Sequence, residues 1–101
     1  MNLPRKGCKV ITLDDIQYRW KAYSTTRGTE VRVAYNEIEG GQILVAQVPK
    51  LFNLKWVTPI IDFGLDNGWE PGEDHAPIYI RKIREHFRLL TPEEVEEASS
   101  R

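Results

Sequence analysis

The residues of this chain that could do chemistry are few: one cysteine, two histidines and several neighbouring carboxylates. Covalent catalysis needs a nucleophile, a base and a group that orients the base. Cys8 with His75 or His86 would supply the first two. No glycine-rich elbow surrounds Cys8, and a half-buried cysteine acting as a small hydrophobic residue explains it equally well. We therefore predict no catalytic residue, and an enzyme is the less favoured interpretation.

Metal and cofactor sites have equally little support. Zinc sites place His or Cys at short defined spacings, such as two His four apart on a helix, whereas residues 73–75 read Glu-Asp-His with His86 eleven positions on. Asp62 and Asp66 share a helical face, which a solvated surface also explains. Phosphate loops lead from strand to helix, but Gly40-Gly41 leads from a loop into a strand. We expect no metal and no cofactor.

A basic strand face is the candidate for nucleic-acid binding. The alternation over residues 16–23 puts Arg19, Lys21 and Tyr23 on one side of a strand. Arg32 lies on the next strand, and Arg27 lies in the loop between them. Sheets that bind single strands combine cations with stacking aromatic residues. With one aromatic residue and a net charge of −1, a solvated sheet face explains the same pattern, so weak nucleic-acid binding is the alternative function.

Aromatic residues indicate a protein interface instead. Phe52, Trp56, Trp69 and Tyr79 supply more aromatic surface than a thin core needs, and Trp and Tyr are favoured interface anchors. They are also favoured core residues, so burial is the competing explanation. The partner would be an unknown protein or a second copy of the chain in a dimer. Nucleic acid is the less favoured partner, and we expect no membrane association.

Length and composition set the frame for these candidates. The chain has 101 residues, 41% of them hydrophobic and 29% charged, which predicts one globular domain. No apolar run approaches the roughly 20 residues that span a bilayer, and the lone Cys8 cannot form an internal disulfide, so we expect a cytoplasmic protein. Residues 1–36 carry seven basic and three acidic side chains, and residues 37–101 carry seven and twelve. This difference in charge either marks a basic face or lets the two parts of the chain attract each other within the fold.

Hydrophobic periodicity predicts β-structure in the first half of the chain. Alternating or apolar runs predict strands over residues 8–13, 16–23, 31–35 and 43–48. Asp14-Asp15 is a turn signal. The polar residues 24–30 predict a loop, and Gly40-Gly41 favours a tight hairpin turn.

A short helix follows over residues 57–68. Thr58 is placed to cap its N-terminus, and Pro59 suits the first helical position. Gly68 is placed to adopt a positive φ and end the helix, and Pro71 prevents a restart. We expect this helix to lie on the sheet, with Trp69 folding back as an anchor.

The segments on either side of this helix leave alternatives open. Residues 50–56 predict either a strand or a loop held by its aromatic side chains. Residues 77–81 predict a strand. From Ile80 onward the apolar spacing becomes helical, with a second strand over residues 86–90 as the alternative. Residues 91–94, Thr-Pro-Glu-Glu, form a capping box that predicts a final acidic helix, which would dock on a basic partner or on the chain's own basic half.

Three short motifs carry a resemblance. Tyr18 and Trp20 form Y-x-W, residues 57–59 read V-T-P, and residues 68–71 read G-W-E-P. This pattern resembles a group of small bacterial proteins without assigned function. Members of that group end soon after the strand that follows G-W-x-P, whereas this chain continues through residues 81–101. The resemblance implies no activity and no catalytic residue.

Together these patterns predict a single α+β domain over residues 1–101. A single antiparallel sheet of four to five strands would carry one covering helix and a helical C-terminus, with residues 1–7 disordered and residues 98–101 a frayed tail. The predicted core is Ile16, Tyr18, Trp20, Val31, Val33, Ile43, Val45, Ile60, Ile61, Leu65, Trp69 and Ile78. The favoured function is a non-enzymatic protein-interaction or accessory module.

Overall fold

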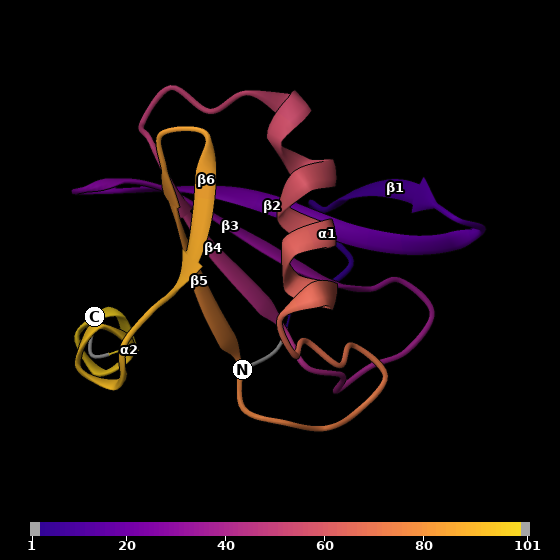
Figure 1. Ribbon diagram of the computed structural model, residues 1–101. Helices are drawn as coiled ribbons and strands as arrows, with labels where there is room; N and C mark the ends of the chain where they lie inside the picture. The colour runs from indigo at the N-terminus through magenta and orange to yellow at the C-terminus, as the bar shows by residue number, and fades with distance from the viewer. Residues whose placement is uncertain (1–2, 100–101) are drawn as a thin grey trace.

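The fold is one six-stranded sheet with a helix packed on each side, as described here by a computed structural model of residues 3–99 (Figure 1). Strand order in the sheet follows chain order. The strands are β1 (Lys9–Leu13), β2 (Ile16–Thr25), β3 (Gly28–Tyr35), β4 (Leu44–Val48), β5 (Ile78–Ile83) and β6 (His86–Leu89). A short 3₁₀ turn, η1 (Leu54–Trp56), leads into α1 (Val57–Asp66), and α2 (Pro92–Ser99) ends the described chain. The α+β class is confirmed, but the expected four to five strands are six.

The sheet is mixed, and the expectation of a wholly antiparallel sheet is wrong. Strand β5 pairs with β4 in parallel, with Leu44 opposite Ile78, while the other neighbours are antiparallel. The parallel pair arises because α1 carries the chain back along the sheet before β5 begins, as a parallel connection requires. Strand β4 is buried along most of its length, as is typical of a strand covered on both faces.

Two tight turns join the first three strands. Asp14 and Asp15 adopt φ values of 51° and 65°, the backbone of a type I′ turn, and so confirm the predicted turn. The loop expected over residues 24–30 is mostly strand instead, because β2 continues to Thr25 and β3 begins at Gly28. Gly28 has a φ of 151° and passes close to the backbone of Val48, where a Cβ atom would lie 2.7 Å from the carbonyl oxygen.

The predicted tight turn at Gly40-Gly41 is also wrong. Residues 36–43 form an open connection between β3 and β4. Gly41 serves a close approach instead, because a Cβ atom there would collide with the carbonyl oxygen of Pro71. This contact holds the connection against the segment that follows α1.

Residues 82–90 form a hairpin and not a helix. Strands β5 and β6 pair with Ile83 opposite His86, and Arg84 makes the turn with a φ of 56°. The helical spacing of Ile80, Ile83, Phe87 and Leu90 was therefore coincidental, and the alternative of a second strand is confirmed.

Helix α1 ends as predicted but begins differently. Thr58 does not cap the helix, because residue 56 precedes the first helical residue and η1 continues directly into α1. Asn53 instead accepts a hydrogen bond from the Lys55 N–H at the start of η1. At the other end Gly68 has a φ of 95°, and the Trp69 N–H donates to the Gly64 carbonyl at 2.9 Å, which is the Schellman arrangement.

The first hydrophobic core lies between the sheet and α1. It contains most of the predicted core and also Leu44, Ala46, Val48, Val57 and Ile80. Residues 50–56 are the loop alternative, held by aromatic side chains against this core. Two predicted core members, Ile16 and Leu65, are exposed, and Ile78 is half-buried.

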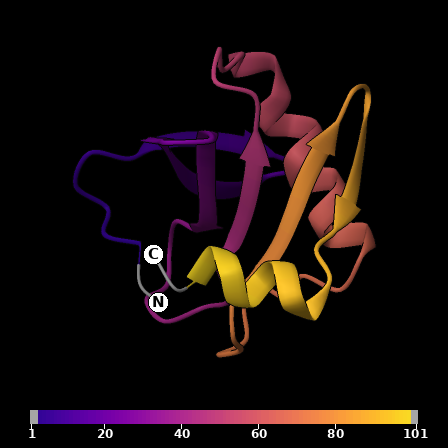
Figure 2. The same cartoon turned by 90° about the vertical axis from the view of Figure 1, so that its left-hand side faces the viewer.

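A second, smaller core lies on the opposite face. Figure 2 shows α2 in front of β4 and β5, with α1 behind them. Val95 and Ala98 of α2 pack against a cluster of Leu3, Ala34, Ile43, Val45, Tyr79 and Leu90. Leu3 is fully buried, which contradicts the expected disorder there, and α2 continues through residue 99, within the expected frayed tail. Residues 1–2 and 100–101 lie outside the described residues.

Neither helix within residues 3–99 has the length and apolar character to cross a bilayer.

Candidate functional site

Arg19 is not part of a solvent-facing basic surface. Its side chain is 2% exposed. Nε donates to the Leu3 carbonyl at 2.8 Å, and Nη1 donates to the carbonyls of Tyr35 and Ile38. Burial lowers the pKa of the guanidinium, and the Glu39 carboxylate at 3.9 Å opposes that effect. Arg19 therefore holds the second face together and is unavailable to nucleic acid.

The other predicted nucleic-acid residues lie near one another on that face. Lys21 Nζ and Arg32 Cζ lie 5.1 and 4.7 Å from the ring centroid of Tyr23. Because both cations lie over this ring, a base that stacks there must displace at least one of them. Arg27 stands in the β2–β3 turn and forms an ion pair with Glu97 of α2.

A polar row crosses four strands beside these residues. The cross-strand partners are Glu30, Gln47, Arg81 and Arg88, on β3 to β6 in order. Arg81 Nε donates to Gln47 Oε1 at 2.8 Å, and Glu30 accepts from Arg32 Nε at 2.6 Å. The side-chain amide of Gln47 is therefore held in one orientation, between Arg81 on one side and the Glu30–Arg32 pair on the other.

Glu94 joins this row to α2. Its carboxylate accepts hydrogen bonds from Arg81 Nη1 at 2.8 Å and from Arg88 at 2.7 Å. Glu94 also accepts from the Thr91 N–H, and the Thr91 hydroxyl accepts from the Glu94 N–H, which confirms the predicted capping box. The hydrogen bonds from Arg88 and Thr91 lower the pKa of Glu94 well below its usual range. The acidic helix therefore docks on the chain's own cations, in part from the basic first half.

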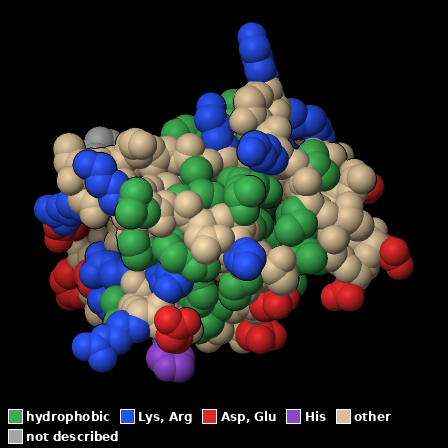
Figure 3. All heavy atoms as spheres, turned by 90° about the horizontal axis from the view of Figure 1, so that it is seen from above, with side chains coloured by type: hydrophobic (Ala, Val, Ile, Leu, Met, Phe, Trp, Pro, Cys, Tyr) green, Lys and Arg blue, Asp and Glu red, His purple; other side chains and the backbone are tan. Residues whose placement is uncertain are grey.

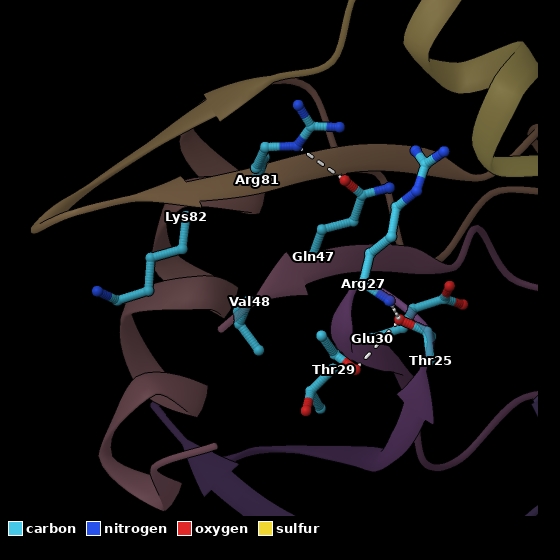
Figure 4. Close-up of a pocket in the computed structure, with 9 residues that line it drawn as sticks. Thr25, Arg27, Thr29, Glu30, Gln47, Val48, Arg81 and Lys82 are labelled. Carbon is cyan, nitrogen blue, oxygen red and sulfur yellow. Dashed lines mark hydrogen bonds between the residues drawn. The ribbon is translucent and has the colours of Figure 1, made fainter. Parts of the chain in front are cut away.

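A cavity of about 280 Å³ opens where β4 ends, between the β2–β3 turn and β5. Its walls include Thr25, Arg27, Gln47, Val48 and Arg81. Figure 4 shows the guanidinium of Arg27, the amide of Gln47 and the guanidinium of Arg81 on the same side of this cavity, while Lys82 points away from them. The cavity exists because β4 stops at Val48 before Pro49, while the neighbouring chain on both sides continues.

Two of the predicted interface aromatics are core residues. Trp69 and Tyr79 are 3% and 6% exposed. The Trp69 indole N–H donates to the Gln42 carbonyl at 2.9 Å, and Tyr79 belongs to the second core. Both are therefore excluded from an interface in the folded chain.

Phe52 and Trp56 remain partly exposed and form one row with Trp20. The ring centroids of Trp20 and Phe52 lie 5.6 Å apart, and those of Phe52 and Trp56 lie 6.1 Å apart. A lysine stands over each end, with Lys9 Nζ 5.8 Å from the Trp20 ring and Lys82 Nζ 4.7 Å from the Trp56 ring. The sheet supplies both lysines and Trp20, and the segment after β4 supplies Phe52 and Trp56.

Two leucines extend this row into solvent. Leu51 is 88% exposed and Leu54 is 61% exposed, and exposed Lys50 and Lys55 stand beside them in the sequence. We call Trp20, Leu51, Phe52, Leu54 and Trp56 the aromatic ridge.

The face that carries the ridge is apolar at its centre and charged around it. Seen from above in Figure 3, hydrophobic side chains gather across this face, with Lys and Arg side chains among them and both basic and acidic side chains toward the edges. A groove of about 270 Å³ lies beside the ridge, and its lining includes Trp20, Phe52, Leu54, Lys9 and Lys21.

The sequence prediction missed the exposed leucines and the two lysines over the aromatic rings. Residues 50–56 read K-L-F-N-L-K-W, and this mixture of leucine, aromatic and lysine residues beside a strand-ending Pro49 was a usable signal. Lys9 and Lys82 carried no signal, since their positions depend on the pairing of strands far apart in sequence.

The candidate catalytic residues are not brought together. His75 lies 3.3 Å from Glu70 and is half exposed, and His86 is exposed in β6. Cys8 donates to the Pro4 carbonyl, and burial raises the pKa of its thiol, which disfavours the reactive thiolate. Among residues 3–99, no group of three or more His, Cys, Asp or Glu residues has the arrangement to hold a metal ion.

In comparisons with protein-family models, curated protein sequences and solved structures, nothing matches this chain.

Proposed function

We propose that this protein is a non-enzymatic interaction module that binds a partner protein through the aromatic ridge. The observation that carries the proposal is the exposure of Leu51 and Leu54 beside a row of three aromatic rings with a lysine over each end. Contiguous exposed apolar surface with a polar rim is typical of protein-binding sites.

The charge of the rim defines the chemistry of the partner. Lys9, Lys21, Lys50, Lys55 and Lys82 lie in or beside the ridge and its groove. Opposite charges across an interface speed association and exclude wrong partners. The partner is therefore a protein segment that presents apolar side chains between acidic ones.

Affinity capture with paired variants tests this proposal. We expect the wild-type chain to retain a partner in stoichiometric amount, and Leu51→Ser/Leu54→Ser to lose it. The control is Leu65→Ser/Leu89→Ser, which removes two leucines that are also exposed, on α1 and β6, and which should retain the partner. Light scattering of the same proteins reports whether the partner is a second copy.

Equal capture by both double variants would contradict the proposal, as would a monomer that retains no stoichiometric protein. Thermal melts of each variant establish that it is folded before capture is compared.

Weak nucleic-acid binding is the second candidate function, because Lys21 and Arg32 flank Tyr23 on one sheet face with Arg27 nearby. If this second function is correct, nucleic acid should be recovered with the protein. Nuclease should remove it, and about 0.3 M salt should release it. Binding should also weaken after Lys21→Gln/Arg32→Gln, with Leu51→Ser/Leu54→Ser unaffected.

A further inference from the structure

We propose that the cavity at the end of β4 is a binding site for a phosphate group. The site lies at the end of β4 and contains none of the residues of the aromatic ridge, although Lys82, which stands over the Trp56 ring, forms part of its wall. Its ligand-facing groups are the guanidinium groups of Arg27 and Arg81 and the amide of Gln47, all of which line the cavity. At about 280 Å³ the cavity lies at the small end of the ~300–1,000 Å³ typical of ligand pockets, so it suits a small ligand.

Donors face this cavity from three different strands or turns. The hydrogen bond from Arg81 Nε to Gln47 Oε1 fixes the amide, and Figure 4 shows its nitrogen directed toward the side where Arg27 passes. A guanidinium has five N–H donors, and Arg81 uses one for Gln47 and one for Glu94. Arginine and amide N–H groups converging on one space are the arrangement that binds phosphate oxygens.

The local charge favours a phosphate over a carboxylate. Three cations and one carboxylate line the cavity: Arg27, Arg81 and Lys82 with Glu30. Glu30 is paired with Arg32, and Glu94 is held by two arginines and the capping box. Glu97 is different, because its pair with Arg27 is exposed on both sides, and exposed ion pairs are weak.

A ligand that replaces Glu97 at Arg27 therefore meets a lining of three cations and one carboxylate, a net charge of +2. A phosphate monoester carries about −1.5 to −2 at neutral pH, which matches this charge better than a carboxylate or a phosphodiester does. Glu97 thus acts as an internal competitor for the site.

Titration with inorganic phosphate at low ionic strength, followed by residue-resolved amide NMR, tests the proposal. We expect saturable shifts at Gly28, Thr29, Gln47 and Arg81, including the Gln47 side-chain amide, and weakening in salt. The same titration with phosphoserine distinguishes a phosphate ester from free phosphate as the ligand. Tighter binding than inorganic phosphate supports the proposal with an ester as ligand, and equal binding supports it with free phosphate as ligand.

Matched variants make the test specific. Arg27→Gln should weaken phosphate binding about tenfold, whereas Arg84→Gln removes an exposed arginine of the β5–β6 turn and should not. Glu97→Gln should strengthen binding about two- to fivefold, whereas Glu96→Gln makes the same charge change one residue away and should not. Gln47→Glu keeps the acceptor for Arg81 but turns a carboxylate into the cavity, and should abolish binding.

The proposal is overturned if the shifts do not saturate by about 20 mM phosphate at low ionic strength. It is also overturned if each variant and its control change binding equally, since that result indicates attraction to surface charge in general. The Gln47→Glu variant preserves the contact with Arg81, so unchanged binding in this folded variant would also exclude the site. Failure here would leave the ridge proposal untouched, because no variant used alters the aromatic ridge.

Discussion

The buried guanidinium of Arg19 forms hydrogen bonds to three segments of the chain that are far from it in the sequence. Arg19 on β2 donates to carbonyl oxygens of residues 3, 35 and 38. These oxygens belong to the N-terminal segment, the end of β3 and the β3–β4 connection. A buried polar group that loses its partner costs more free energy than the hydrogen bond had contributed, so this residue has a large effect on stability.

Arg19→Met should lower the free energy of unfolding by about 2–4 kcal/mol, because it removes the donor to the buried Leu3 carbonyl and to the part-buried carbonyls of Tyr35 and Ile38. Urea denaturation measures the change. Lys21→Met is the matched control on the same strand face, where the lysine is half-buried and its ammonium group lies over the Tyr23 ring. We expect this control to cost less than about 1 kcal/mol. Equal losses would show that Arg19 acts through charge and not through its carbonyl contacts.

Gly64 lies where α1 comes closest to the sheet. A Cβ atom there would lie 2.7 Å from Leu44 Cδ2 and 3.0 Å from Trp69 Cε3. Alanine gains about 1 kcal/mol in helix propensity, and overpacking of a closed core costs about 1–3 kcal/mol. Gly64→Ala should therefore lower the free energy of unfolding by about 1 kcal/mol.

Gly72→Ala is the control for that substitution, because its Cβ atom would make ordinary contact with Tyr35 at 3.5 Å. We expect a change within about 0.5 kcal/mol. Stabilisation by Gly64→Ala in the same denaturation experiment would mean that α1 can move away from Leu44 at little cost.

The sequence was sufficient to select candidate binding residues by their type, but it was not sufficient to predict which of them are exposed to solvent. The alternation of β2 correctly separated Arg19, Lys21 and Tyr23 from the α1 face. It could not show that the N-terminal segment and α2 cover that second face, because both lie far away in sequence. The same limit applies to Trp69 and Tyr79, which are core residues, and to Phe52, which is partly exposed.

At the scale of elements, α2 is attached to the sheet mainly through glutamates. Glu94 is bound by Arg81 and Arg88, and Glu97 by Arg27, while Val95 and Ala98 supply the apolar contact. The helix has eight residues, which is too short to be stable alone. Its position therefore depends on these ion pairs and on the capping box.

The pKa of Glu94 is lowered in the folded chain, so its contribution to stability has a definite pH dependence. A depressed folded-state pKa gives stability that is present above the unfolded pKa, about 4.3 for glutamate, and that is lost as the pH falls toward the folded value. Glu94→Gln should melt at a lower temperature than wild type at pH 7, and the difference should shrink below about pH 4.

Thermal melts between pH 7 and pH 3 measure this difference. Glu93→Gln is the control, because Glu93 is exposed and lies in the same helical turn. A difference between wild type and Glu94→Gln that stays constant down to pH 3 would contradict an ionised Glu94 as the source of the stability.

Local patterns predicted the elements better than their pairing. The Schellman end of α1 and the capping box of α2 depend on a few adjacent residues, and both were predictable. The parallel pairing of β4 and β5 depends on where α1 returns the chain, which alternation does not encode. The all-apolar start of β4 was a signal for a central strand buried on both faces.

At the scale of the whole molecule, the candidate surfaces occupy different places. The aromatic ridge lies beside the first core, where residues 50–56 connect β4 to α1, and the cavity opens at the end of β4, between the β2–β3 turn and β5. The central strands β3 and β4 lie between both cores. The buried central strands therefore support two candidate surfaces, the aromatic ridge and the cavity, and both are formed by segments that are less buried.

This arrangement predicts a graded pattern of amide hydrogen exchange. Strands β3 and β4 have neighbours on both sides and side chains buried on both faces, whereas β1 and β6 are the edges of the sheet and largely exposed. Central amides should exchange only through global unfolding, and edge amides through local opening that is roughly 100-fold or more faster. Exchange followed by NMR at neutral pH measures both classes. Uniform protection across the six strands would mean that the edges open only with the centre, and that the ridge and α2 are held as firmly as the core.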